Sequence, residues 1–192
     1  MASPASSGAS IRYVIDSQVS QFTVQAFAGG LISSASHSPK IAIREWTGQV
    51  QVSASATGSS SLKVRVKSAS LEVVDELRES DRLEIQRVMK MEVLQTDRFP
   101  EITYDSSEVR LEKQKEDLYR ASVVGRLTLH GVTHDHEFFS QVALGSDTAR
   151  AYGNFTVRQS DYNIGIASIA GGVLKLQDEL KFSFYVVARR QG

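Results

Sequence analysis

The stretch VVGRLTLHGVTHDHEF, residues 123–138, has the pattern of a strand, a tight turn and a second strand. Leu127 and Leu129 fall on one face of the first strand, and the polar residues between them fall on the other. Gly131 supplies the backbone freedom that a chain reversal needs. Because such units recur through the chain, the sequence predicts a closed antiparallel sheet with an apolar interior.

Alternating apolar and polar residues mark further strands on both sides of this hairpin. Val64 and Val66, for example, alternate with Lys63 and Arg65 in the stretch 61–71. The expected strands are residues 12–16, 21–27, 47–54, 61–71, 101–105, 109–111, 118–130, 136–144, 150–159 and 180–189.

One helix interrupts the strands at residues 81–95, where apolar residues recur at helical spacing from Ile85 through Val88 to Val93. Ser80 is the expected N-cap. Many short antiparallel strands with a single helix predict an all-β barrel or sandwich, with the helix packed at an end or a side.

The composition bounds the class of protein. The 192 residues favour one domain, which we place at residues 11–192 behind a disordered tail at residues 1–10. The 22 basic and 22 acidic residues give zero net charge, which argues against a nucleic-acid partner because phosphates demand an excess of cations.

Cysteine is absent, so disulfides and thiolate chemistry are excluded. No run approaches the roughly 18 apolar residues of a membrane span. The sequence as written has no signal peptide, and periplasmic and cytoplasmic locations both stay open.

Four segments carry a family resemblance. They are YVID at 13–16 followed by Ser20, Phe22 and Val24; ASL at 69–71, which leads into the charged segment around 80–82; VL at 93–94 through FPEITYDS at 99–106; and GRLTLHGVT at 125–133, the most specific. Together they resemble the YceI-like family, whose members have a lipocalin-like eight-stranded barrel, and the likeness covers residues 11–190. Many members carry a His just before the Ser of the first strand. This chain has Val19 there and departs from the pattern, and the nearest His is His37.

The resemblance implies a non-enzymatic carrier of a long apolar ligand, with polyisoprenoids the best-known case. Burial of an apolar chain supplies about 0.8 kcal/mol per methylene, so such binding needs no polar chemistry. The runner-up is a ligand-free barrel that acts as a stress-related or protein-interaction scaffold. A homodimer is left open under both.

Alternate residues of a strand point to opposite faces of the sheet, and this parity selects the candidate ligand-binding residues. The inward-facing set is Phe22, Val24, Val64, Val66, Ile102, Tyr104, Leu127, Leu129, Phe155, Phe182 and Phe184. His37 is added as a polar residue at the barrel mouth that meets a ligand head group. Parity does not separate a lumen lined by these side chains from one filled by them, and the resemblance favours the lined lumen.

Three other groups of residues suggest chemistry but have simpler explanations. His130, His134 and His136 resemble a metal site, yet a polar hairpin accounts for them. The acidic residues of 72–84 are interleaved with arginines, as on a solvated helical face. Serines flank His37 without a Gly-x-Ser-x-Gly elbow. We therefore expect no catalytic residue, no metal and no cofactor.

Overall fold

The computed structural model describes residues 10–29, 38–53, 60–165, 168–169 and 174–191. Its strands are β1 (Ser10–Ile15), β2 (Gln21–Gly29), β3 (Lys40–Ile43), β4 (Trp46–Ser53), β5 (Ser61–Lys67), β6 (Leu71–Val73), β7 (Glu101–Lys113), β8 (Leu118–Leu129), β9 (Val132–Leu144), β10 (Thr148–Arg158), β11 (Ser168–Ile169) and β12 (Leu174–Gln191). The helical elements are η2 (Ser68–Ser70), α1 (Glu79–Val88), the π-helical turn η3 (Met89–Val93) and the 3₁₀ turn η4 (Gln159–Tyr162).

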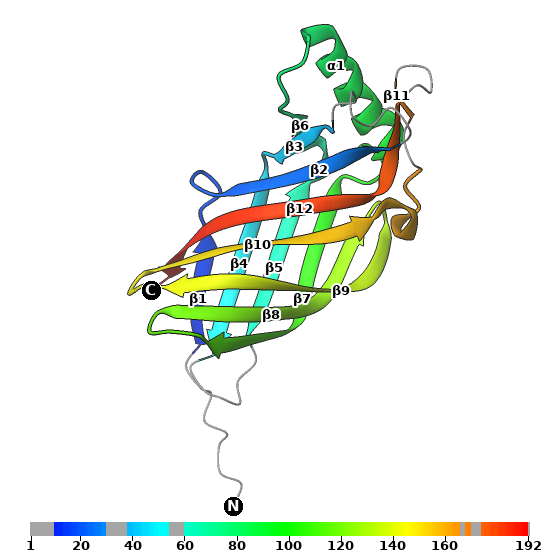
Figure 1. Ribbon diagram of the computed structural model, residues 1–192. Helices are drawn as coiled ribbons and strands as arrows, with labels where there is room; N and C mark the ends of the chain where they lie inside the picture. Colours follow the sequence, from blue (N-terminus) through cyan, green and yellow to red (C-terminus); the bar gives the residue numbers. More distant parts are fainter. Residues whose placement is uncertain (1–9, 30–37, 54–59, 166–167, 170–173, 192) are drawn as a thin grey trace, which may run out of the picture.

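Eight of the strands form a closed antiparallel ring in the order β1-β4-β5-β7-β8-β9-β10-β12, and β12 pairs back with β1 (Figure 1). Closure leaves these strands without a free edge over the paired length. The prediction of an eight-stranded antiparallel barrel with one inserted helix is confirmed.

The remaining sheet grows out of β12 at the end of the barrel where α1 lies (Figure 1). The first part of β12 pairs with β2, which pairs with β3, which in turn pairs with β6. Short bends separate β3 from β4 and β5 from β6, and at both bends the Ser70 hydroxyl makes contacts. It donates to the Lys67 carbonyl at 2.7 Å and accepts from the Glu45 N–H at 3.0 Å. At this end the sheet therefore stops at β6, beside the helix.

The hairpin that joins β8 to β9 is the tight turn that the sequence predicts. Leu129 pairs with Val132, so the loop is the two residues His130 and Gly131. Both have positive φ, 52° and 75°, as a type I′ turn requires. A side chain at position 131 would also meet the ring of Phe99, since an added Cβ would lie 2.7 Å from it.

The helix starts and ends two residues earlier than expected. α1 and η3 together span residues 79–93 instead of 81–95. The N-cap position is Arg78, with no side-chain cap, so the prediction of Ser80 as N-cap is wrong. Asp81 instead accepts a hydrogen bond from the Arg78 side chain.

Several strand boundaries also differ from the sequence pattern. The expected strand 61–71 is broken by η2, and the two expected strands 101–105 and 109–111 are one strand, β7, with a bulge between Ser106 and Glu108. β12 begins at Leu174, six residues before the expected start. β3, β6 and β11 are not predicted. The expected tail at residues 1–10 lies outside the described residues except for Ser10, which begins β1.

Candidate functional site: an apolar cavity inside the barrel

The barrel interior holds a cavity of about 260 Å³ that is partly open to solvent. Its lining follows the inward face of each ring strand and, on β8, extends from Ala121 to Leu129. That stretch is about 26 Å long at the usual rise of a strand. Among the described residues that line the cavity, none is an Asp, Glu, Lys, Arg or His. The interior is therefore an environment for an apolar molecule.

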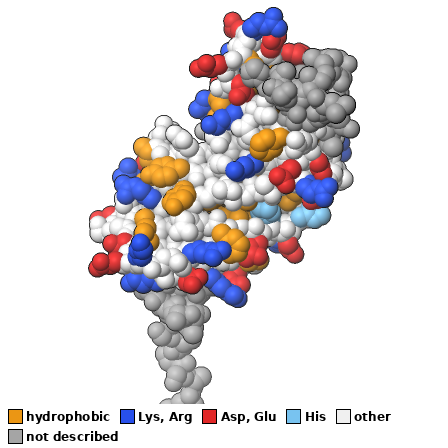
Figure 2. All heavy atoms as spheres, viewed as in Figure 1, with side chains coloured by type: hydrophobic (Ala, Val, Ile, Leu, Met, Phe, Trp, Pro, Cys, Tyr) orange, Lys and Arg blue, Asp and Glu red, His pale blue; other side chains and the backbone are white. Residues whose placement is uncertain are grey.

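The outer surface has the opposite character. In the view of Figure 2, basic and acidic side chains are interspersed over the barrel wall. On the outside of the barrel, the Arg65–Asp105 ion pair of 2.9 Å joins β5 to β7, and the Arg189–Asp16 ion pair of 3.1 Å joins β12 to the residue after β1. The alternation of strand residues thus separates a charged exterior from an uncharged lumen.

All eleven residues that the strand alternation selects line the cavity: Phe22, Val24, Val64, Val66, Ile102, Tyr104, Leu127, Leu129, Phe155, Phe182 and Phe184. The structure thereby brings together side chains from β2, β5, β7, β8, β10 and β12. His37 lies outside the described residues, so its place at the mouth stays a prediction. The role of the other eleven in binding is likewise a proposal that their position supports.

Aromatic rings form a connected belt along the inner wall. The Phe155 and Phe182 rings stack with centroids 4.9 Å apart, and Phe22 contacts Phe182 edge-on at 6.2 Å. Phe138 joins the belt to Tyr104, at 5.4 Å, and Trp46 extends it from Phe22, at 5.8 Å. Such rings offer broad apolar faces to a ligand while they hold one another in place.

Sequence reasoning missed the contribution of the helix. Ile85, Val88, Met89, Val93 and Leu94 line the cavity, so α1 and η3 form part of its wall. Their helical spacing was visible, but spacing alone does not say which surface the apolar face covers. Trp46 and Phe138 also line the cavity, although parity did not select them.

Polar groups in the lining are engaged by the protein itself. The Tyr104 hydroxyl donates to the His136 carbonyl at 3.0 Å, and Gln159 Nε2 donates to the Gln177 carbonyl at 2.9 Å. Burial, with a smaller effect of the nearby Glu137 carboxylate, raises the pKa of Tyr104 well above its ordinary value. Tyr104 is therefore a neutral donor at physiological pH, not an acid or a base.

The histidines of the β8–β9 hairpin do not converge on one point. His130 Nδ1 lies 3.2 Å from the Tyr162 carbonyl and His134 Nε2 lies 2.8 Å from the Asp161 carbonyl, so both rings contact η4. His136 packs against the Phe155 ring at 4.9 Å. In the described part of the chain, no group of three or more His, Asp or Glu side chains could hold a metal ion.

The acidic segment forms surface ion pairs. Glu72 pairs with Arg44 at 2.6 Å, and Glu84 pairs with Arg87 at 2.9 Å. The hydrogen bond from Arg87 holds the pKa of Glu84 below its ordinary value. Neither carboxylate lines the cavity, and the pairs Arg78–Asp81 and Glu84–Arg87 are spaced i,i+3. Within the described residues, no helix combines the length and apolar character that crossing a membrane requires.

Comparison with known proteins places the chain in a family. A YceI-like domain matches residues 13–188. Among solved structures, the chain resembles BcnA of Burkholderia cenocepacia, with a TM-score of 0.68, 18% identity, and coverage of 90% of this chain and 98% of that chain. It also resembles a polyisoprenoid binding domain from Saccharophagus degradans implicated in plant cell wall breakdown, with a TM-score of 0.69, 12% identity, and coverage of 93% and 98%.

A Campylobacter jejuni YCEI protein has a TM-score of 0.58 and 15% identity, with coverage of 79% of this chain and 85% of that chain. At these identities the structural likeness establishes the fold alone. A search of curated proteins gives no match.

Proposed function

This chain belongs to the YceI-like family, and on that premise we propose that its barrel binds and carries a long apolar ligand, an isoprenoid or fatty-acid-like lipid, without catalysing a reaction. The observation that carries the proposal is the cavity of about 260 Å³ whose described lining has no charged side chain. The similar fold of a polyisoprenoid binding domain supports it.

The volume of the cavity sets how much of a ligand it can hold without rearrangement. A dry apolar cavity of about 150 Å³ holds one benzene, so this cavity accommodates roughly ten carbon atoms on the same scale. Burial of ten methylenes contributes about 8 kcal/mol, against an association cost of roughly 4–15 kcal/mol. A chain of that length binds weakly at best. We therefore propose a longer ligand, for which the belt side chains or the helix must move.

The experiment is a search for a copurified lipid followed by a titration. Native mass spectrometry of the purified protein, with organic extraction of the same sample, is expected to show a bound apolar molecule and also reports the number of subunits. A fluorescent fatty acid probe is then titrated into delipidated protein. A protein with neither an extractable lipid nor probe binding contradicts the proposal and leaves the ligand-free scaffold.

A matched pair of variants tests whether the probe occupies the lumen. Ala151→Phe places a ring in the cavity, because Ala151 lines it, whereas Ala143→Phe places the same ring on β9 at a position that does not line it. Displacement of two buried methylenes corresponds to about a tenfold loss of affinity for Ala151→Phe. Ala143→Phe is expected to bind like the wild type. Equal affinities in two folded variants would place the probe outside the barrel.

A further inference from the structure

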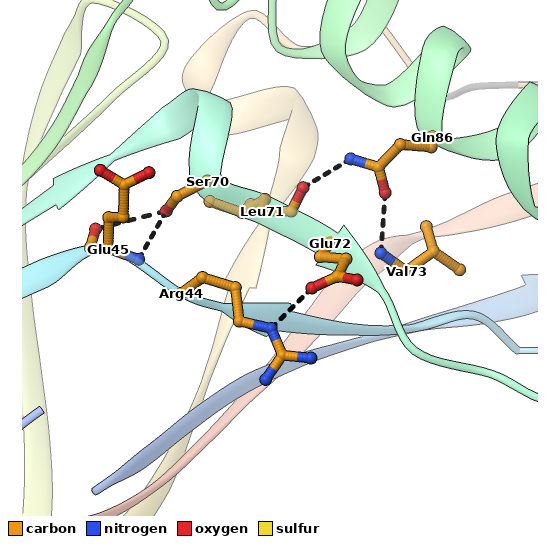
Figure 3. Close-up of polar contacts among 7 residues, drawn as sticks. All are labelled: Arg44, Glu45, Ser70, Leu71, Glu72, Val73 and Gln86. Atoms are coloured by element: carbon orange, nitrogen blue, oxygen red, sulfur yellow. Dashed lines mark hydrogen bonds and ion pairs between the residues drawn. The ribbon is translucent and has the colours of Figure 1, made fainter. Parts of the chain in front are cut away.

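At one edge of β6, where a neighbouring strand could pair, a side chain of α1 makes the hydrogen bonds to the backbone. Gln86 Nε2 donates to the Leu71 carbonyl at 2.6 Å, and Gln86 Oε1 accepts from the Val73 N–H at 2.8 Å (Figure 3). The carbonyl of one residue and the N–H two residues later are the groups that a parallel neighbouring strand would bond. The side-chain amide of Gln86 thus takes the place of the N–H and the C=O of one residue in a missing strand.

We call this junction between β6 and α1 the seam. On its other edge β6 pairs with β3 over three residues, and the Arg44–Glu72 ion pair of 2.6 Å spans that edge (Figure 3). Within the ring of eight strands, adjacent strands share longer ladders, such as the β8–β9 ladder that extends from Leu118 to Leu129. Among the described residues, the two bonds of Gln86 are the hydrogen bonds that join α1 to the sheet.

The helix at the seam is both a wall of the cavity and a loosely packed element. Ile85 and Val88 line the cavity, yet no residue of α1 is buried, and Leu83 is 56% exposed. The helix leads directly into the π-helical turn η3, where the Leu94 N–H bonds the Met89 carbonyl. Helices interrupted in this way often serve functional sites. Movement of α1 from β6 would break two side-chain bonds and leave every strand ladder intact.

We propose that the seam is the entrance through which the ligand reaches the cavity, and that Gln86 is the residue that holds this entrance closed. The inference rests on the proposed function, because an entrance presupposes a ligand. It also gives a longer ligand room beyond the volume of the cavity, since displacement of α1 removes one wall. Gln86 does not line the cavity, so it controls access without forming the binding surface.

The test is the rate of ligand exchange in a matched pair of variants. Gln86→Met keeps the length of the side chain and removes both hydrogen bonds. Glu72→Gln breaks the ion pair on the opposite edge of the same strand. We expect Gln86→Met to raise both the association and the dissociation rate constants of a fluorescent long-chain alcohol about tenfold in stopped-flow measurements. Because both rates rise together, the dissociation constant changes far less. Glu72→Gln is expected to exchange like the wild type.

A second variant keeps the test decisive if Gln86→Met loosens the fold. In Gln86→Glu the ionised carboxylate still accepts from the Val73 N–H but repels the Leu71 carbonyl, while the protonated acid can donate to that carbonyl. Association of the uncharged probe should therefore be fast at pH 7 and slow towards the wild-type rate as the pH falls through the carboxyl pKa, about 4.3 for a free glutamate. The wild-type rate measured over the same pH range is the reference.

The outcomes separate the two proposals. A wild-type protein that binds no probe overturns the proposed function, and the entrance falls with it. A wild-type protein that binds the probe, with unchanged rates in Gln86→Met and no pH-dependent rate in Gln86→Glu, overturns the entrance alone.

Discussion

At the scale of single residues, the barrel wall depends on one close approach between β7 and β8. A Cβ added to Gly125 would lie 2.5 Å from the Asp105 carbonyl oxygen and 2.8 Å from the Tyr104 hydroxyl. The neighbouring bulge in β7 and the Tyr104–His136 hydrogen bond both lie at this point. A glycine here lets the tyrosine reach across β8 to the backbone of β9.

We therefore expect Gly125→Ala to destabilise the protein by about 1–3 kcal/mol, the usual cost of forcing atoms into a packed site. Gly165→Ala is the matched control, because a Cβ at that position meets no atom within 4 Å. Urea unfolding of both variants measures the free energies. Equal stabilities would show that β7 and β8 separate here without strain.

His136 makes the stability depend on pH. Burial lowers the pKa of His136 below its ordinary 6.5, and its Nε2 is buried with no partner among the described residues. Below pH 6.5 the unfolded chain takes up a proton that the folded protein binds less well, so the free energy of unfolding decreases as the pH falls.

His136→Phe removes this proton uptake and should flatten the pH dependence of urea unfolding below pH 6.5. The same decrease in the variant as in the wild type would assign the effect to other groups. Above pH 6.5 the contribution of His136 to stability is fully present, so the two proteins should differ there by a constant amount.

At the scale of elements, α1 begins without a side-chain cap. Its N-cap is Arg78, which provides no oxygen for the free backbone N–H groups of the first turn. Arg78→Ser would supply that oxygen and, with Asp81 three residues later, resemble a capping box. The Arg78–Asp81 ion pair that is lost is exposed and contributes little.

We expect Arg78→Ser to stabilise α1 by about 0.5–2 kcal/mol, visible as slower hydrogen exchange of its amides. Arg78→Ala is the control, since it removes the same ion pair without adding a cap. Faster exchange in Arg78→Ser than in Arg78→Ala would contradict the assigned N-cap.

Most of the strands could be predicted because their inward residues are apolar and their outward residues are polar, as where Val64 and Val66 alternate with Lys63 and Arg65. The bend at Glu45 and the turn at Ser70 could not be predicted, because Ser70, the last residue of η2, bonds a residue 25 positions away. β3 has four residues and β6 has three, too few for an alternation to be recognised. The orientation of α1 could not be predicted either, because its hydrogen bonds to the sheet are made with β6, which the sequence does not predict.

At the scale of the whole molecule, parity predicted which side chains point inward but not whether they meet. Eight strands give an interior that side chains can either fill or line, and the balance depends on strand tilt and on the packing of particular rings. Here Phe155 and Phe182 stack against each other along the wall, and a cavity of about 260 Å³ remains. That volume is a property of the assembled barrel, so no local pattern in the sequence encodes it.

Ring closure has a consequence for synthesis on the ribosome. β12 pairs with β10, β2 and β1, yet it follows every other ring strand in the chain. β1 leaves the ribosome early, but β12, the strand that closes the ring on it, is translated last. During that interval the apolar inner faces of the strands are exposed to solvent, so we expect the nascent chain to bind chaperones.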